Sequence, residues 1–60
     1  MSKPIRWTYD NRVMRLPVES TNDWVNVRDE VLRDAALLAK AVGVVEVRDH
    51  ANILLATVRA

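Results

Sequence analysis

The chain contains no cysteine and a single histidine, and each shortage removes a class of protein. Disulfide bonds are excluded, and a structural zinc site lacks its usual ligands because His50 is the only imidazole. One glycine, Gly43, is too few for a glycine-rich phosphate loop. No apolar run approaches the ~18 residues of a membrane span. Arg6, Trp7 and Asp10 stand where a signal peptide needs apolar residues, so we expect a cytoplasmic protein.

The chain is also short, with 60 residues and a mass of 6.8 kDa. This length predicts a single domain over residues 1–60. Half of the residues are hydrophobic and 28% are charged, a composition typical of an ordered protein. A domain this small buries only about 60% of the surface of its unfolded chain, so it is marginal as a monomer. Without disulfides or a metal, self-association or binding to a partner is the remaining source of stability, and we expect a homodimer.

The net charge of +1 conceals an uneven distribution. Residues 1–18 carry four basic residues against one acidic residue, which gives +3. Residues 19–42 carry three basic against five acidic residues, which gives −2, and residues 43–60 are neutral. Because charges act on partners within a Debye length, this polarity matters more for binding than the net charge does.

The first segment has the alternation of a β-hairpin with strands at about residues 5–9 and 12–18. Asp10 and Asn11 both tolerate the positive φ of a two-residue turn, and this turn places Tyr9 opposite Arg12 and Arg6 opposite Arg15. The register puts the large apolar residues on one face: Ile5, Trp7, Tyr9, Met14 and Leu16.

The middle segment predicts one helix at about residues 22–42. N-cap residues cluster from Ser20 to Asp23, and Gly43 stands where a helix usually ends. One face is apolar at helical spacing, through Trp24, Val27, Val31, Ala35, Leu38 and Val42.

The last segment predicts a second hairpin, with strands at about residues 44–49 and 53–59. The turn at residues 49–52 places Arg48 opposite Ile53 and Val47 opposite Leu54. The outer face of this hairpin then carries three aliphatic side chains: Val44, Ile53 and Leu55.

The predicted fold is therefore α+β, with the order ββαββ and one long helix on a four-stranded, mainly antiparallel sheet. Proline cannot donate to a strand ladder, so Pro17 favours an edge position for the second strand and the strand order 2-1-3-4. A helix of some twenty residues is ~30 Å long, whereas six-residue strands span ~20 Å. The helix should overhang the sheet, and a second copy of the chain is the simplest cover.

Two groups of residues are candidate binding sites. Basic residues of the first hairpin form a candidate site for an anion or an acidic partner, because paired guanidinium groups bind oxyanions well; a solvated basic face is the competing interpretation. These residues are Lys3, Arg6, Arg12 and Arg15. Apolar residues on the outer face of the second hairpin, and at the overhanging start of the helix, form a candidate oligomer interface. These residues are Trp24, Val44, Ile53 and Leu55.

The sequence contains no catalytic constellation. His50 lies next to Asp49, but no nucleophile is spaced to join them, so we expect neither an enzyme nor a bound metal or cofactor. The favoured hypothesis is a small regulator or inhibitor of the kind that phages and plasmids carry, which self-associates and binds an acidic protein surface, with no membrane partner. The first alternative is nucleic-acid binding through the basic hairpin, and the second is a ligand-storing oligomer. The predicted core position of Trp7 and Tyr9 weighs against nucleic acid, because single-strand binders present exposed aromatic residues.

Overall fold

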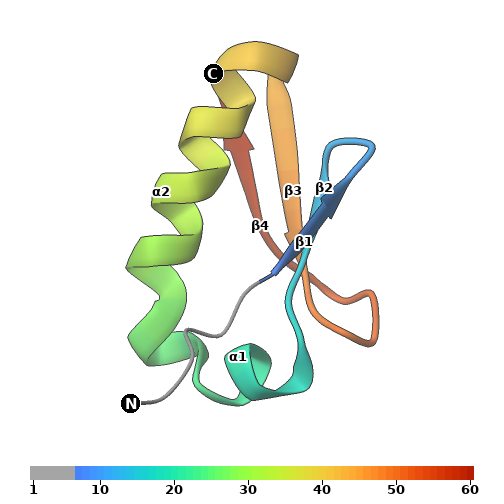
Figure 1. Ribbon diagram of the computed structural model, residues 1–60, viewed down its shortest axis with the longest axis vertical. Coiled ribbons are helices and arrows are strands. Elements are labelled where there is room, and N and C mark those ends of the chain that lie inside the picture. The colour runs from blue at the N-terminus through green and yellow to red at the C-terminus, as the bar shows by residue number, and fades with distance from the viewer. Residues whose placement is uncertain (1–6) are drawn as a thin grey trace.

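A computed structural model describes residues 7–60, in which one long helix lies against one face of a four-stranded sheet (Figure 1). This arrangement confirms the α+β class and the ββαββ order, to which the structure adds a short helix. Residues 5 and 6 of the predicted first strand lie outside the described residues. The elements are β1 (Thr8–Asp10), β2 (Val13–Arg15), α1 (Val18–Asn22), α2 (Trp24–Val42), β3 (Val44–Arg48) and β4 (Leu54–Arg59).

The strand order is β1-β2-β3-β4, so the predicted order 2-1-3-4 is wrong. β1 pairs antiparallel with β2, β3 pairs antiparallel with β4, and the two central strands β2 and β3 are parallel. The prediction failed because it assigned Pro17 to the second strand. β2 ends at Arg15, two residues before the proline, so Pro17 places no constraint on which strand lies at the edge.

The turn of the first hairpin lies one residue later than predicted, at Asn11 and Arg12, with φ values of 49° and 67°. Tyr9 therefore pairs with Met14 rather than with Arg12. Moving the turn by one residue changes each pairing by two residues, and a shift of two keeps every side chain on the same face. The predicted apolar face survives for this reason, although the register was wrong.

The helix α1 was not predicted and replaces the expected end of the second strand. Pro17 precedes its first turn with a φ of −70°, and the Pro17 carbonyl accepts hydrogen bonds from the backbone N–H and the Oγ1 hydroxyl of Thr21, both at 3.0 Å. Proline suits this position because its missing N–H needs no partner there. Figure 1 shows α1 beside the start of α2, and Ser20 of α1 is fully buried. The N-terminal overhang of the long helix is thus partly covered by the same chain.

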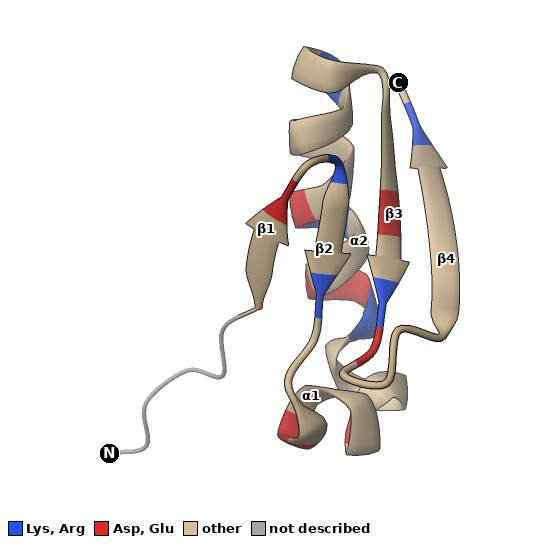
Figure 2. Ribbon diagram, turned by 90° about the vertical axis from the view of Figure 1, so that its right-hand side faces the viewer, with Lys and Arg blue, Asp and Glu red and all other residues tan. Residues whose placement is uncertain are grey.

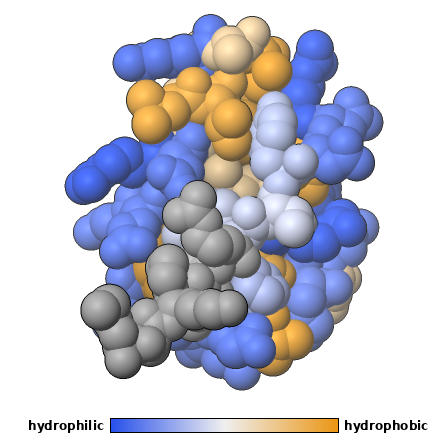
Figure 3. Space-filling model, viewed as in Figure 1, coloured by the Kyte–Doolittle hydropathy of each residue, from blue (hydrophilic) through white to orange (hydrophobic). Residues whose placement is uncertain are grey.

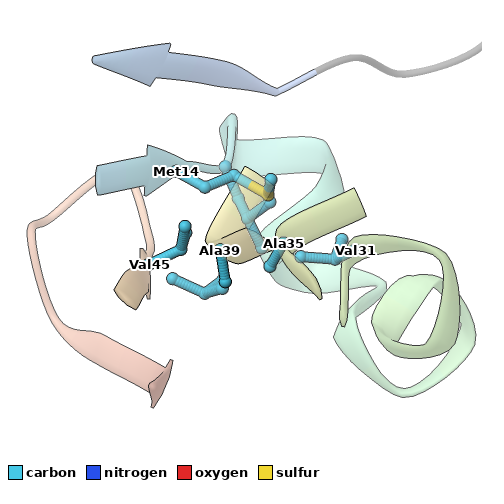
Figure 4. Packing of buried hydrophobic residues seen from close by; sticks show 7 residues of the cluster. Met14, Val31, Ala35, Ala39 and Val45 are labelled. Atoms are coloured by element: carbon cyan, nitrogen blue, oxygen red, sulfur yellow. The ribbon is translucent and has the colours of Figure 1, made fainter. Parts of the chain in front are cut away.

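The helix α2 carries the apolar face that its spacing predicted. Val31, Ala35 and Ala39 are fully buried, and Trp24 and Val42 at the two ends pack against the same core. Figure 4 shows Met14 and Val45 of the sheet pointing toward these helix residues. Gly43 ends the helix with a φ of 95°, as predicted, and its N–H donates to the Ala39 carbonyl at 2.7 Å.

The second hairpin contains a bulge, and as a result two neighbouring leucines face the opposite sides from those predicted. Val47 pairs with Ala56, but Arg48 pairs with Leu54, so Leu55 has no partner of its own on β3. Leu54 is 47% exposed, whereas Leu55 is half-buried against the core. The sequence predicted the opposite, with Leu54 on the core face and Leu55 outside. An extra residue in one strand displaces the side-chain alternation, and alternation in the sequence does not reveal it.

Candidate interaction surface

One face of the sheet is left uncovered by the described residues. α2 packs on the other face, and Figure 2 shows the four strands in front with the helix behind them. Alternate residues of each strand point away from the helix, and we call the surface that they form the open face. Its strand residues are Thr8, Asp10, Val13, Arg15, Val44, Glu46, Arg48, Leu54, Thr57 and Arg59.

The open face is predominantly basic. Arginines from β2, β3, β4 and the first turn lie toward the two ends of the strands, with Glu46 between them on β3 (Figure 2). Asp10 is the second carboxylate, so four arginines against two carboxylates give a net charge of +2. The arginines are Arg12, Arg15, Arg48 and Arg59. Arg12 and Arg15 come from the first hairpin, Arg48 from β3 and Arg59 from β4, so the charge is a property of the folded sheet.

At one end of the open face, two guanidinium groups meet at a single residue. Arg15 and Arg48 are direct partners in the parallel pairing of β2 with β3. Arg15 Nη2 donates to Asn52 Oδ1 at 3.0 Å, and Arg48 Nη1 donates to the Asn52 carbonyl oxygen at 2.8 Å. Arg48 Nε also donates to Glu46 Oε1 at 3.1 Å, which is the one ion pair within residues 7–60.

The loop that carries Asn52 is held in place by a buried carboxylate. Asp49 is only 7% exposed, and its Oδ1 accepts hydrogen bonds from the backbone N–H groups of Ala51 at 2.8 Å and Ile53 at 2.9 Å. Asn52 adopts a φ of 69°, a conformation that asparagine tolerates better than most residues. The β3–β4 loop therefore presents Asn52 to both arginines in a defined position.

At the other end of the open face lies a shallow hollow of about 410 Å³. Its walls combine two arginines with a carboxylate and aliphatic side chains. The lining residues are Asn11, Arg12, Val13, Val44, Glu46, Thr57 and Arg59.

Of the four basic residues that the sequence grouped together, the structure describes two, and it places them apart. Lys3 and Arg6 lie outside the described residues, and Arg12 and Arg15 lie at opposite ends of the open face. Arg15 pairs with Thr8, so the predicted opposition of Arg15 to Arg6 is wrong. Its basic neighbour is Arg48, which comes from the second hairpin.

Sequence reasoning missed three residues of this surface: Arg48, Arg59 and Asn52. The alternation of Glu46 with Arg48 did place both on the outer face of their strand. Their proximity to Arg15 depends on the parallel pairing of β2 with β3, and no short-range pattern encodes that pairing.

The residues predicted for an oligomer interface lie in three different environments. Trp24 and Leu55 are half-buried against the core, so the outer-face position of Leu55 was wrong. Val44 lies on the open face and lines its hollow. Ile53, at the end of the β3–β4 loop, is 60% exposed. Of this group, only Val44 thus belongs to the open face, and Ile53 is exposed in the β3–β4 loop.

All three aromatic residues lie away from the open face. Trp7 Nε1 donates to Asp34 Oδ2 of α2 at 3.1 Å, and Tyr9 pairs with Met14 on the helix side of the sheet. Together with Leu37, these residues line a hollow of about 280 Å³ between β1 and α2. Figure 3 shows hydrophobic side chains gathered near the C-terminal half of α2 on this side. The basic surface therefore offers no aromatic platform for stacking bases.

Comparisons with known proteins add no assignment to this surface. None of the helices within residues 7–60 is long and apolar enough to span a bilayer. No protein family model, curated protein or solved structure matches the chain.

Proposed function

We propose that this chain is a non-enzymatic interaction module that binds an acidic surface of another protein through its open face. The observation that carries the proposal is the convergence of four arginines from separate segments on a sheet face that the described residues leave bare. Val13, Val44 and Leu54 lie among them, and protein interfaces combine arginine with such apolar contacts. The basic charge steers an acidic partner toward this face.

A module of this size acts by occupying a surface of its partner, so we propose a regulator or inhibitor that works in the cytoplasm. We also propose that it self-associates, because a 60-residue chain has a small core and leaves Ile53 and Leu37 each 60% exposed. The same basic face would attract nucleic acid, but the position of Trp7 and Tyr9 on the helix side favours a protein partner.

A capture experiment with reversed charges tests this proposal. The variant Arg12→Glu/Arg15→Glu/Arg59→Glu should lose the partners that the unmodified chain captures from a lysate of its source organism. The matched control is Arg28→Glu/Arg33→Glu/Lys40→Glu, which makes the same change in net charge at exposed positions of α2. The control should retain those partners. Equal capture by both variants, or equal loss, would contradict the assignment of the open face.

A salt titration with a labelled single-stranded oligonucleotide separates the two partner classes. Binding to phosphates weakens steeply as salt concentration rises, so low salt is the most sensitive condition. We expect the unmodified chain not to bind the oligonucleotide through the open face, even at low salt. The contrary result would be binding that is lost in Arg12→Glu/Arg15→Glu/Arg59→Glu and kept in Arg28→Glu/Arg33→Glu/Lys40→Glu. Such binding would instead establish the open face as a nucleic-acid surface.

A further inference from the structure

We propose that Arg15, Arg48 and Asn52 form a carboxylate-binding subsite, and that the adjacent hollow receives the neighbouring apolar side chain of the same ligand. The ligand class is an acidic residue followed by an aliphatic residue in the partner protein. This inference rests on the proposed function and identifies which part of the open face selects the partner.

Two like charges are held side by side at this position. The parallel register makes Arg15 and Arg48 direct neighbours, and Asn52 fixes both guanidinium groups through its two oxygens. Like charges directly opposite each other destabilise a sheet. Glu46 offsets only Arg48, and residues 1–6 contain no carboxylate that could offset Arg15. A bound anion would remove this unfavourable interaction.

The hydrogen-bonding groups of the two arginines are largely unused within the described residues. A guanidinium group has five N–H donors. Arg48 donates through Nε and Nη1, and Arg15 donates only through Nη2. Arg15 Nε and Nη1 and Arg48 Nη2 therefore have no partner within residues 7–60, and two guanidinium groups with free donors can bind a carboxylate from both sides.

The charge of the subsite matches a carboxylate better than a phosphate. Arg15 and Arg48 contribute two positive charges, which Glu46 bonded to Arg48 and the buried Asp49 carboxylate of the same loop partly offset. A carboxylate adds only one negative charge to this balance. A phosphate monoester carries −1.5 to −2 at neutral pH and would leave an excess of negative charge beside Glu46.

An apolar hollow adjoins the subsite and shares Arg15 with it. The hollow has a volume of about 230 Å³. Leu16 is fully buried in the core, so Pro17 is the apolar residue that the hollow exposes, and Thr8 and His50 complete the lining. Because Arg15 belongs to both the hollow and the arginine pair, a ligand that reaches both must carry its charge and its apolar group close together. Adjacent residues of a peptide satisfy this requirement.

Peptide titrations followed by amide and arginine Nε chemical shifts test the inference on the intact protein. The probe is acetyl-Gly-Asp-Leu-Gly-amide at neutral pH and low salt. It should shift the signals of Arg15, Arg48, His50 and Asn52. Replacing Asp by Asn, or Leu by Gly, in the probe should each weaken binding by about fivefold or more. Equal binding of the Asn peptide would overturn the carboxylate assignment, and equal binding of the Gly peptide would overturn the role of the hollow.

Two variants locate the binding. Arg15→Gln should abolish the shifts, and the matched Arg12→Gln change at the far end of the open face should leave the affinity unchanged. Unchanged binding by Arg15→Gln, or tighter binding of inorganic phosphate than of the Asp peptide, would overturn the proposal. Capture of the natural partner that depends on Arg12 and Arg59 but not on Arg15 would overturn this inference and leave the proposed function in place.

Discussion

Single residues with positive φ define the sharp turns of this small sheet. Asn11 and Arg12 form the first turn, Gly43 ends the long helix, and Asn52 shapes the β3–β4 loop. Glycine and asparagine are expected at such positions, whereas arginine is not. Arg12 is therefore the residue that made the first turn hard to place from sequence, because Asp10 and Asn11 are the more favourable pair.

Replacing Asp49 by Ala should lower the free energy of unfolding by about 1–3 kcal/mol. The change leaves the N–H groups of Ala51 and Ile53 without the carboxylate that they donate to. Denaturant unfolding measures the effect. Asp10→Ala is the control, because Asp10 is exposed and its side chain makes no hydrogen bond within the described residues; the control should change stability by less than about 0.5 kcal/mol. A similar loss in both variants would exclude the loop-holding role of Asp49.

Replacing Ser20 by Ala should leave stability unchanged or raise it by about 1 kcal/mol. Ser20 is fully buried, and its hydroxyl has no hydrogen-bond partner among the described residues. Thr21→Ala in the same helix is the comparison, because it removes the hydrogen bond from Oγ1 to the Pro17 carbonyl and should be destabilising. Thermal unfolding of the two variants should show opposite directions, and a large loss for Ser20→Ala would show that its hydroxyl is bonded.

At the level of helices and strands, the faces were easier to predict than the pairings. The apolar face of α2 follows from the spacing of Val31 and Ala35, and the core face of the first hairpin survived an error in the turn because strand alternation has a period of two. The bulge at Leu55 and the helix α1 escaped prediction. Both depend on contacts with the rest of the fold and leave no periodic signal in five or six residues.

The bulge leads to a prediction about two adjacent leucines. Leu55→Glu should destabilise the fold by about 2 kcal/mol, because it places a carboxylate against the core. Leu54→Glu should change stability by less than about 0.5 kcal/mol, because Leu54 points to solvent. Thermal unfolding of both variants checks this. The reverse result would mean that β4 pairs with β3 without a bulge.

For the molecule as a whole, the sequence predicted half of the basic surface. The second hairpin supplies Arg48 and Arg59, and only the parallel contact of β2 with β3 brings them beside Arg15 and Val13. Which strands pair over such a long sequence separation depends on how all the elements pack together in the core. The local sequence pattern does not contain this information, and the predicted strand order was wrong for the same reason. The length argument for self-association is independent of these errors.

Sedimentation equilibrium at micromolar concentration should detect a species of twice the 6.8 kDa chain mass. Self-association stabilises the folded state by mass action, so the midpoint of thermal unfolding should rise with protein concentration. Ile53→Ser in the β3–β4 loop and Leu37→Ser on α2, at the two most exposed leucine and isoleucine positions, should identify the contact surface. A single 6.8 kDa species with a concentration-independent midpoint would contradict dimer formation.

The parallel pairing of β2 with β3 also has a kinetic consequence. Each antiparallel hairpin joins residues close in sequence, whereas the central pair joins Val13 to Glu46 across both helices. Closing a longer loop costs more chain entropy, so we expect the central pair to form after the two hairpins. Asn52 would then form its hydrogen bonds with Arg15 and Arg48 only after β2 and β3 have paired. A chain in which both hairpins had formed but had not yet paired would contain all four arginines without an assembled binding surface. Only the completely folded chain would therefore bind the partner.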